Sequence, residues 1–452
     1  MPTASERSTL AALRVFPDSA EVTATGELAI GGRTVTSLAE QFGTPLYVYD
    51  EAGIRRRAER FRTALGDGYP GRSIVCYAAK AYCAPWLLRL LAEEDLGLDV
   101  VSGGELFTAL VSGFPAERVS FHGNNKSIDE LTYAVSSGVG RIVLDNLDEI
   151  GTLGRLADSL RVVQGVVLRV GPGVDPHTHA HLTTGAPDSK FGLGIAGGEA
   201  DRGIDAILGH PSMDLHGIHA HIGSQIFEMA PYEVEIERLF QFAAMVRDRT
   251  GVELREISPG GGFGVRYLPD APEIDPSDMI RRVGGLVAGA AARHGLDNPF
   301  PTLSIEPGRS MIASSAVAVY RVGSIKSIPG GRTYVAVDGG MADNIRPTAY
   351  GEGYTAVIAD RPTATGDTEV AIAGRYCETG DMLIQQIRLP APRVGDLVAI
   401  PVAGAYQLSM SSNYNMSPRP AVVVVANGQA RLTRRRESYE DLLAAELVDS
   451  EG

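Results

Sequence analysis

A lysine and a carboxylate, each placed at the end of an apolar run, are the residues of this sequence most suited to chemistry. Lys80 follows the run Ser73 to Ala79, and Glu306 follows Leu303 to Ile305. A lysine at the end of a buried strand loses part of its hydration, so its amine becomes neutral more easily and can attack a carbonyl. The alternative is a lysine whose stem is buried while its ammonium reaches water. The surrounding sequence must decide between the two.

Glycine and arginine follow two of the later apolar runs. Gly260-Gly261-Gly262 comes after Glu256–Ser258, and Gly308 and Arg309 come directly after Glu306-Pro307. Backbone N–H groups of a glycine loop can approach an anion closely, and in barrels the loops after strands seven and eight commonly bind phosphate. A glycine triplet alone is more often a flexible turn, and Glu306 with Arg309 could be a structural ion pair. The placement of both loops favours a phosphate site.

Eight apolar runs, most of them separated by helical patterns, would position these residues. In Tyr232 to Arg247, for example, apolar residues recur at helical spacing. The pattern predicts an α/β fold, a (β/α)₈ TIM barrel with active-site residues at the carboxyl ends of its strands. A doubly wound open sheet is the alternative, but no G-x-G-x-x-G follows the first strand. The expected strands are Ile74–Ala78, Leu98–Val101, Val119–His122, Arg141–Leu144, Val166–Val170, Leu215–His221, Glu256–Ser258 and Leu303–Glu306.

The two ends of the chain predict a second, mostly antiparallel β-domain. Glu27 to Val35 indicates a hairpin and Pro45 to Tyr49 a strand, and both would join the C-terminal strands. We expect residues 1–48 to be N-terminal strands of this domain, 49–310 the barrel and 311–452 the C-terminal β-domain. The expected C-terminal strands are Ala316–Val319, Tyr334–Val337, Val370–Ala373, Leu397–Pro401 and Ala421–Val425.

The predicted strand ends together match the needs of pyridoxal 5'-phosphate (PLP). Lys80 supplies the amine that bonds to the cofactor's aldehyde, and Gly261, Gly262 and Arg309 hold its phosphate. Glu306 keeps the pyridine nitrogen protonated, and His221 offers a flat imidazole for stacking on the ring. His221 could instead be a core histidine whose nitrogens bond to the backbone.

Composition excludes several classes of partner. The net charge of −14 disfavours nucleic acid, and no apolar run is long enough to span a membrane. Cys76, Cys83 and Cys377 form no CxxC motif and leave an odd thiol, which favours a cytoplasmic protein with free cysteines. His177, His179 and His181 alternate in one loop. Because no cysteine or carboxylate cluster completes a site, we expect no metal there, but a lid or cofactor-edge loop.

Seven motifs resemble those of the diaminopimelate decarboxylases, which belong to the PLP-dependent, alanine-racemase-like barrel decarboxylases. The resemblance runs from about Pro45 to the C-terminal region. It implies PLP-dependent decarboxylation of meso-2,6-diaminopimelate to L-lysine and CO₂, the last step of lysine biosynthesis. It also implies a head-to-tail homodimer with active sites at the interface. The motifs are Tyr77-Ala78-Ala79-Lys80-Ala81, His122-Gly123-Asn124-Asn125-Lys126, Ser189-Lys190-Phe191-Gly192, His221-Ile222-Gly223-Ser224-Gln225, Glu306-Pro307-Gly308-Arg309, Cys377-Glu378-Thr379-Gly380-Asp381 and Gly404-Ala405-Tyr406.

The resemblance assigns roles residue by residue. Lys80 would form the Schiff base with PLP, and Cys377 would be the proton donor that reaches in from the neighbouring subunit. His221 would stack on the ring and Glu306 would bind the pyridine nitrogen. The residues around the phosphate would be Ser224, Gly261, Gly262, Gly308, Arg309 and Tyr406, and those around the substrate Arg309, Arg346, Tyr350, Glu378 and Tyr406.

Two of these residues bear on the choice of substrate. The fork of Arg346 suits a distal carboxylate and Glu378 suits a distal ammonium, so together they favour a zwitterionic end over the bare amine of ornithine or lysine. Ala220 and Ser258-Pro259 depart from the usual family pattern close to the cofactor. They leave open a related decarboxylase of another amino acid, free or tethered to a carrier protein. A catalytically dead regulatory protein and a racemase are further alternatives. Lys80, Cys377 and Glu378 argue against the first, and the pairing of Arg346 with Glu378 argues against the second.

Overall fold

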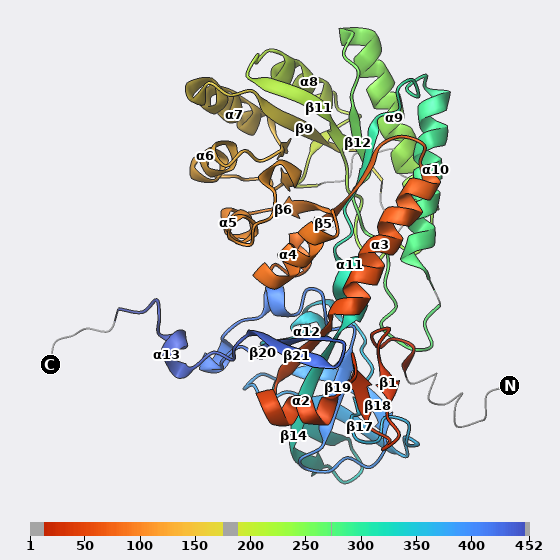
Figure 1. Cartoon of the computed structure of the whole chain (residues 1–452), viewed down its shortest axis with the longest axis vertical. Coiled ribbons are helices and arrows are strands. Elements are labelled where there is room, and N and C mark those ends of the chain that lie inside the picture. Colours follow the sequence, from red (N-terminus) through yellow and green to blue (C-terminus); the bar gives the residue numbers. More distant parts are fainter. Residues whose placement is uncertain (1–12, 175–188, 273, 448–452) are drawn as a thin grey trace. The chain divides into compact units, whose positions relative to one another are not determined.

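The computed structural model describes residues 13–174, 189–272 and 274–447, and it divides them into two compact units (Figure 1). Unit 1 comprises the described residues of Met1–Ile54, Arg266–Glu273 and Ile312–Gly452. Unit 2 comprises those of Arg55–Val265 and Ile274–Met311. Unit 1 therefore draws on three separate stretches of the chain.

A closed barrel of eight parallel strands forms the centre of unit 2 in the described chain. Each strand pairs with the next in sequence, and β13 closes the circle by pairing with β5, with Leu303 opposite Ser73. A two-residue strand, β10 (Leu193–Gly194), adds to the edge of β9. The predicted TIM barrel is confirmed. Its strands are β5 (Ser73–Ala78), β6 (Gly97–Val100), β7 (Val119–Phe121), β8 (Arg141–Leu144), β9 (Gln164–Gly171), β11 (Met213–His219), β12 (Glu256–Ser258) and β13 (Thr302–Ile305).

Helices follow the strands and lie outside the sheet, as Figure 1 shows. Several begin at a side-chain cap that follows a strand end: Ser102, Ser127 and Asn146 accept a hydrogen bond from a backbone N–H of the first helical turn. Each cap fixes the residue at which the loop ends and the next helix begins, so the loops that follow these strands stay short. The helices are α3 (Glu51–Gly68), α4 (Pro85–Glu93), α5 (Gly103–Val111), α6 (Ile128–Ser136), α7 (Leu147–Leu160), α8 (Glu199–Leu208), α9 (Ala230–Thr250), α10 (Pro276–Arg293) and α11 (Arg309–Ile312), with 3₁₀ turns at Ala79–Ala81 and Ala116–Arg118.

A mixed, mostly antiparallel sheet forms unit 1. Its long strand β14 (Ala316–Ser327) pairs with β15, β19 and β4, and β4 (Leu46–Asp50) pairs in parallel with β20. The expected participation of the Pro45–Tyr49 strand in this sheet is confirmed. The other strands are β15 (Thr333–Val337), β16 (Val357–Ile358), β17 (Thr368–Ala373), β18 (Met382–Leu389), β19 (Leu397–Pro401), β20 (Ala421–Ala426) and β21 (Gln429–Arg434).

The predicted N-terminal hairpin exists but belongs to its own small sheet. This antiparallel sheet has three strands, β1 (Glu21–Val22), β2 (Leu28–Ile30) and β3 (Arg33–Thr34), and α2 (Val35–Phe42) follows it. Leu28, Ile30 and Val35 are fully buried in the hydrophobic core of unit 1. The short helices α12 (Arg346–Tyr350) and α13 (Tyr439–Leu442) and the 3₁₀ turns Ala313–Ser315, Leu408–Met410 and Tyr414–Met416 complete the described elements of the second half.

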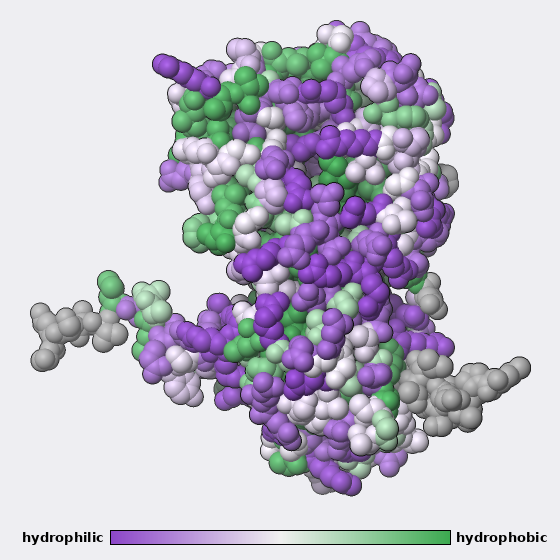
Figure 2. All heavy atoms as spheres, in the orientation of Figure 1, coloured by the Kyte–Doolittle hydropathy of each residue, from purple (hydrophilic) through white to green (hydrophobic). Residues whose placement is uncertain are grey.

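The surface of unit 2 is uneven in hydropathy. Figure 2 shows hydrophobic side chains gathered over α5 and α7, whereas hydrophilic side chains cover α3. On α5, Phe107 is 57% exposed and Val111 58%.

Across the described ranges, none of the helices combines the length and the apolar character needed to cross a bilayer. His177, His179 and His181, which we expect in a lid or cofactor-edge loop, lie outside the described residues.

Candidate active site

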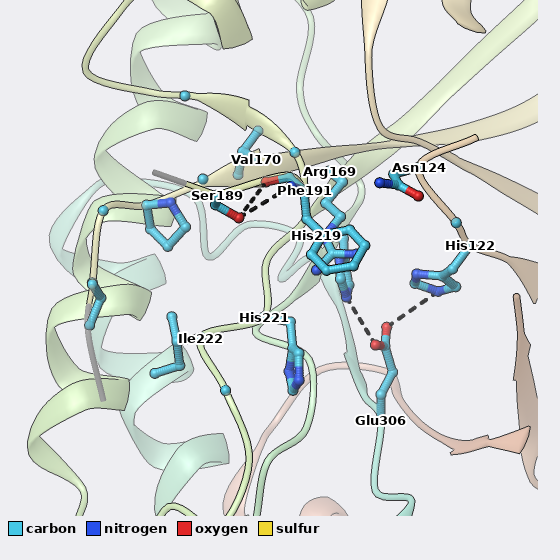
Figure 3. A pocket seen from close by; sticks show the side chains of 18 of the residues that line it. His122, Asn124, Arg169, Val170, Ser189, Phe191, His219, His221, Ile222 and Glu306 are labelled. Atoms are coloured by element: carbon cyan, nitrogen blue, oxygen red, sulfur yellow. Dashed lines mark hydrogen bonds and ion pairs between the residues drawn. The ribbon is translucent and has the colours of Figure 1, made fainter. Parts of the chain in front are cut away.

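A cavity of about 840 Å³ opens among the carboxyl ends of the barrel strands in unit 2 (Figure 3). Its volume is in the range of cavities that hold a cofactor-sized ligand. The residues that line it come from loops and strand ends far apart in the sequence. Those with ionisable side chains are Lys80, Asp99, His122, Arg169, Glu199, His219, His221 and Glu306.

Lys80 reaches the cavity because the chain turns sharply after β5. The 3₁₀ turn Ala79–Ala81 follows the strand at once, and it buries Ala79 and Ala81 while Lys80 lines the cavity. A small side chain on either side of the lysine lets the turn pack tightly against the barrel. The lysine therefore lies at the mouth of the barrel, the position that the sequence predicted.

Glu306 accepts hydrogen bonds on both of its carboxylate oxygens. His219 Nε2 lies 2.9 Å from Oε2, and the Ser258 hydroxyl donates to Oε1 over 3.1 Å. Figure 3 shows the imidazoles of His219 and His122 turned toward this carboxylate. Burial alone would raise the pKa of Glu306, but His219 and His122 together outweigh it and hold the pKa below its ordinary value. Glu306 is thus an ionised carboxylate inside the barrel mouth.

His122 stands between two carboxyl groups. Its Nε2 is 3.5 Å from Asp99 Oδ1 and 3.7 Å from Glu306 Oε1, and its ring meets that of His219 edge to face at 4.8 Å. Burial, followed by the charge of Glu306, raises the pKa of Asp99 well above its ordinary value. Burial likewise lowers the pKa of His122. The negative charge at this site therefore resides on Glu306 and not on Asp99.

His221 lies beyond the end of β11 and is held as a neutral ring. Loss of solvent, together with the charge of Lys80, lowers the pKa of His221 to about 3. The N–H of Gly261 points at its Nδ1 over 3.4 Å, which makes Nδ1 an acceptor. A neutral, flat imidazole of fixed orientation is suited to stacking against a planar ring.

The glycine loop after β12 tolerates no side chain at two positions. A Cβ at Gly261 would lie 2.1 Å from the backbone oxygen of Glu306. A Cβ at Gly262, whose φ is +99°, would lie 2.5 Å from the oxygen of Gly223. The loop backbone can therefore approach an anion closely.

Arg309, Ser224 and Gly308 accompany this loop in unit 2. Arg309 is buried, with its Nη2 3.4 Å from the Ser224 hydroxyl, and Gly308 packs against Ala78. A buried arginine beside a glycine loop is suited to a phosphate. With Lys80, His221 and Glu306 lining the cavity, the residues present fit PLP.

The ligand atoms of His122, His219 and Glu306 lie within 4.8 Å of one another and would also suit a divalent metal. The lysine and the glycine loop favour the organic cofactor.

Unit 1 contains a second group of the predicted residues, around α12. Arg346 is buried, and its Nε and Nη2 each lie 2.6 Å from a different carboxylate oxygen of Glu352. Its guanidinium stacks on Tyr350 at 4.7 Å and on Tyr406 at 5.4 Å. Two of the donors expected to bind a substrate carboxylate are therefore engaged by Glu352. Tyr406 has a φ of 61°, which is rare for a non-glycine residue and common at functional sites.

Cys377 and Glu378 lie on an exposed loop of unit 1. The N–H of Cys377 donates to the side-chain oxygen of Asn415 over 2.9 Å. Asp381, buried at the end of the same loop, accepts from the N–H of Met341 and from that of Tyr376, each over 2.7 Å. The loop is thus fixed at both of its ends while the thiol and the carboxylate face outward.

The sequence did not reveal the protein partners that Glu306 has in the structure. We expected Arg309 or a cofactor nitrogen, whereas its hydrogen-bond partners are His219 and Ser258. His219 and Ser258 stand opposite each other in the register of β11 and β12. A polar residue in the last position of each of two neighbouring strands was the available signal. Asp99, His122 and Arg169, which line the cavity, were also unassigned.

Known proteins resemble the chain over most of its length. The family described as "Pyridoxal-dependent decarboxylase, pyridoxal binding domain" matches residues 51–313. The diaminopimelate decarboxylase of Bacillus subtilis (strain 168) is 46% identical over 423 residues, which cover 93% of this chain and 95% of that protein. The diaminopimelate decarboxylase of Actinosynnema pretiosum subsp. auranticum is 44% identical and covers 93% of each chain. A crystal structure of diaminopimelate decarboxylase from M. jannaschii in co-complex with L-lysine superposes with a TM-score of 0.88 at 32% identity, over 96% of this chain and 98% of that one.

Proposed function

The chain belongs to the diaminopimelate decarboxylase family of pyridoxal-dependent decarboxylases, and from that premise we propose that it converts meso-2,6-diaminopimelate to L-lysine and CO₂. This reaction is the last step of lysine biosynthesis. The observation that carries the proposal is the cavity of unit 2, where Lys80, His221 and the ionised Glu306 meet beside a glycine loop. PLP, when bound, supplies an electron sink for the pair of electrons that the departing carboxylate leaves behind.

In this proposal each residue around the cavity has one task. The amine of Lys80 would hold the cofactor and would serve in release of the product. Glu306, whose pKa is held low by His219 and His122, would keep a proton on the ring nitrogen, and the neutral ring of His221 would stack on the cofactor face. The residues expected to hold the phosphate would be Ser224, Gly261, Gly262, Gly308, Arg309 and Tyr406.

Further residues would recognise the substrate and return a proton. Arg309, Arg346, Tyr350, Glu378 and Tyr406 bind the amino acid, with Glu378 taking the distal ammonium. Arg346 retains donors beyond the two that Glu352 engages, because a guanidinium has five N–H groups. Cys377 donates the proton that replaces the lost carboxyl group.

We further propose that the enzyme is a head-to-tail homodimer in which Cys377 of one subunit serves the cavity of the other. Cys377 is exposed, as a thiol that must reach a second subunit would be. Unit 2 also exposes apolar side chains on α5 that a partner subunit would cover (Figure 2). Cys76, Cys83 and Cys377 are all free thiols, in keeping with a protein of the cytoplasm.

The test is CO₂ release from meso-diaminopimelate, lysine, ornithine, arginine and glutamate, each supplied with excess PLP. We expect diaminopimelate to be turned over fastest, and Lys80→Ala to abolish release from all five. Glu378→Ala should reduce turnover of diaminopimelate about 10²-fold or more, because the distal ammonium of the substrate loses its charged partner. Faster turnover of another amino acid would overturn the assigned substrate.

A second substrate class has one observation in its favour. Because Glu352 already engages two donors of Arg346, the distal carboxylate of diaminopimelate meets a partly occupied arginine. A decarboxylase of another amino acid, free or carrier-tethered, would need no such carboxylate site. The same panel distinguishes the two, since efficient turnover of lysine or ornithine with poor turnover of diaminopimelate would favour this class.

A further inference from the structure

Ser258 connects the carboxylate of Glu306 to the glycine loop. The serine is the last residue of β12 and is 3% exposed. Its hydroxyl donates to Glu306 Oε1 over 3.1 Å and accepts from the N–H of Gly260, also over 3.1 Å. The backbone N–H of Glu306 in turn donates to the oxygen of Gly260 over 2.9 Å. Three hydrogen bonds thus form a closed ring between the ends of strands seven and eight.

The ring leaves little freedom to the residues it joins. Pro259, between Ser258 and Gly260, has a fixed φ and no N–H, so the hydroxyl of Ser258 is placed to cap the next available N–H. That hydroxyl uses its single proton on Glu306. Because each carboxylate oxygen can accept more than one hydrogen bond, Glu306 keeps acceptor capacity for a cofactor nitrogen after binding Ser258 and His219.

We propose that Ser258 is a positioning residue for the cofactor: it ties the carboxylate that binds the ring nitrogen to the loop that binds the phosphate. A ligand that contacts both parts then meets a preorganised pair, not two groups that must be ordered on binding. The proposal rests on the PLP of the proposed function and not on the identity of the substrate.

A purely structural serine makes a different prediction. If Ser258 only satisfied the buried N–H of Gly260, its loss would lower stability and leave the PLP affinity of the folded protein unchanged. If it positions Glu306, the affinity for PLP and the turnover number change together, while KM for the substrate under saturating PLP stays the same. The two roles are therefore separable in one set of variants.

The experiment compares Ser258→Ala, Ser258→Cys and Ser304→Ala with the parent enzyme. Cysteine keeps nearly the volume of serine but donates only weakly. Ser304 is the matched control: it is buried in the neighbouring strand β13, two residues before Glu306, and its hydroxyl contacts Cys76 Sγ at 3.5 Å. PLP affinity is measured by equilibrium dialysis of each folded protein, and kcat and KM under saturating PLP.

We expect Ser258→Ala to weaken PLP binding about tenfold to hundredfold, the range for a hydrogen bond to a charged group. Ser258→Cys should lie between alanine and the parent, and Ser304→Ala should match the parent. Parental affinity in either folded Ser258 variant, or an equal loss in Ser304→Ala, would overturn the proposal. If the parent binds PLP but releases no CO₂ from diaminopimelate, the proposed function fails while the dialysis still tests Ser258.

Discussion

Glu235 is the group whose replacement tests the electrostatics of unit 2 most directly. It lies on α9, is fully buried, and among the described residues neither of its carboxyl oxygens has a hydrogen-bond partner. Burial raises the pKa of Glu235 well above the ordinary 4.5, and the charge of Glu306 raises it further. We therefore expect Glu235 to carry a proton in the folded protein at pH values where an exposed glutamate is ionised.

The sign of the pH dependence follows from this raised pKa. Between pH 4.5 and the raised pKa, the folded protein binds one proton more than the unfolded chain. The contribution of the protonated Glu235 is complete below pH 4.5 and is lost as the pH rises toward the folded pKa. In that window the free energy of unfolding falls by about 1.4 kcal/mol per pH unit.

Two variants separate the cost of ionisation from the cost of burying a polar group. Glu235→Gln keeps the shape and removes the titration, so it should match the parent at pH 4.5 and gain about 1.4 kcal/mol per pH unit above it. Glu235→Met also removes the unpartnered polar group, and it should gain a further ~1–3 kcal/mol at every pH. Glu233→Gln, exposed on the same helix, is the control. It should lose up to ~1 kcal/mol, because Glu233 lies in the first turn and interacts favourably with the helix dipole.

Urea unfolding between pH 4.5 and 8 provides the assay. The chain has one tryptophan, Trp86, which is buried on α4 of unit 2, so its fluorescence reports the unfolding of that unit. A stability gain of Glu235→Gln that is the same at pH 4.5 and at pH 8 would refute the reasoning. So would a pH-dependent gain of equal size in Glu233→Gln.

Two further predictions concern the groups of unit 1. Asp381→Ala removes the acceptor of the Met341 and Tyr376 N–H groups, and we expect it to lower kcat about tenfold by loosening the Cys377 loop. Steady-state kinetics would check it, and an unchanged kcat would contradict it. Arg346→Lys retains the charge but loses the bidentate fork on Glu352, so KM for diaminopimelate should rise about tenfold or more with a smaller change in kcat. Parental KM would show that the fork does not contribute to substrate binding.

The barrel was predictable because its strands are apolar on both faces. A strand such as β8, Arg141–Leu144, is a nearly continuous apolar run whose bounds the sequence predicts correctly. Strands β18 and β21 were missed for the converse reason. Met382–Leu389 contains Gln385, Gln386 and Arg388, and Gln429–Arg434 is largely exposed. These segments are strands because β18 pairs with β17 and β21 pairs with β20. The amino-acid composition of β18 and β21 does not reveal that pairing.

The site was predictable in its positions but not in its contacts. The rule that barrel chemistry lies at strand ends located Lys80, Glu306 and the glycine loop. It could not show that Ser258 faces His219 across the β11–β12 register, so both reach the carboxylate of Glu306. The pairing of Arg346 with Glu352 escaped prediction for a similar reason. It depends on the turn that follows α12, not on the residue types alone.

Three buried carboxyl groups in unit 2 illustrate how those contacts decide function. Asp99, Glu235 and Glu306 are all removed from water, and burial by itself would raise the pKa of each. Of the three, only the pKa of Glu306 is lowered, because His219 and His122 outweigh its burial. Its negative charge adds to the effect of burial in raising the pKa of the other two, so Glu306 is the one of these three carboxyl groups that is held ionised. A single fixed charge beside neutral acids is what a cofactor nitrogen needs, because a second anion would compete for the same proton.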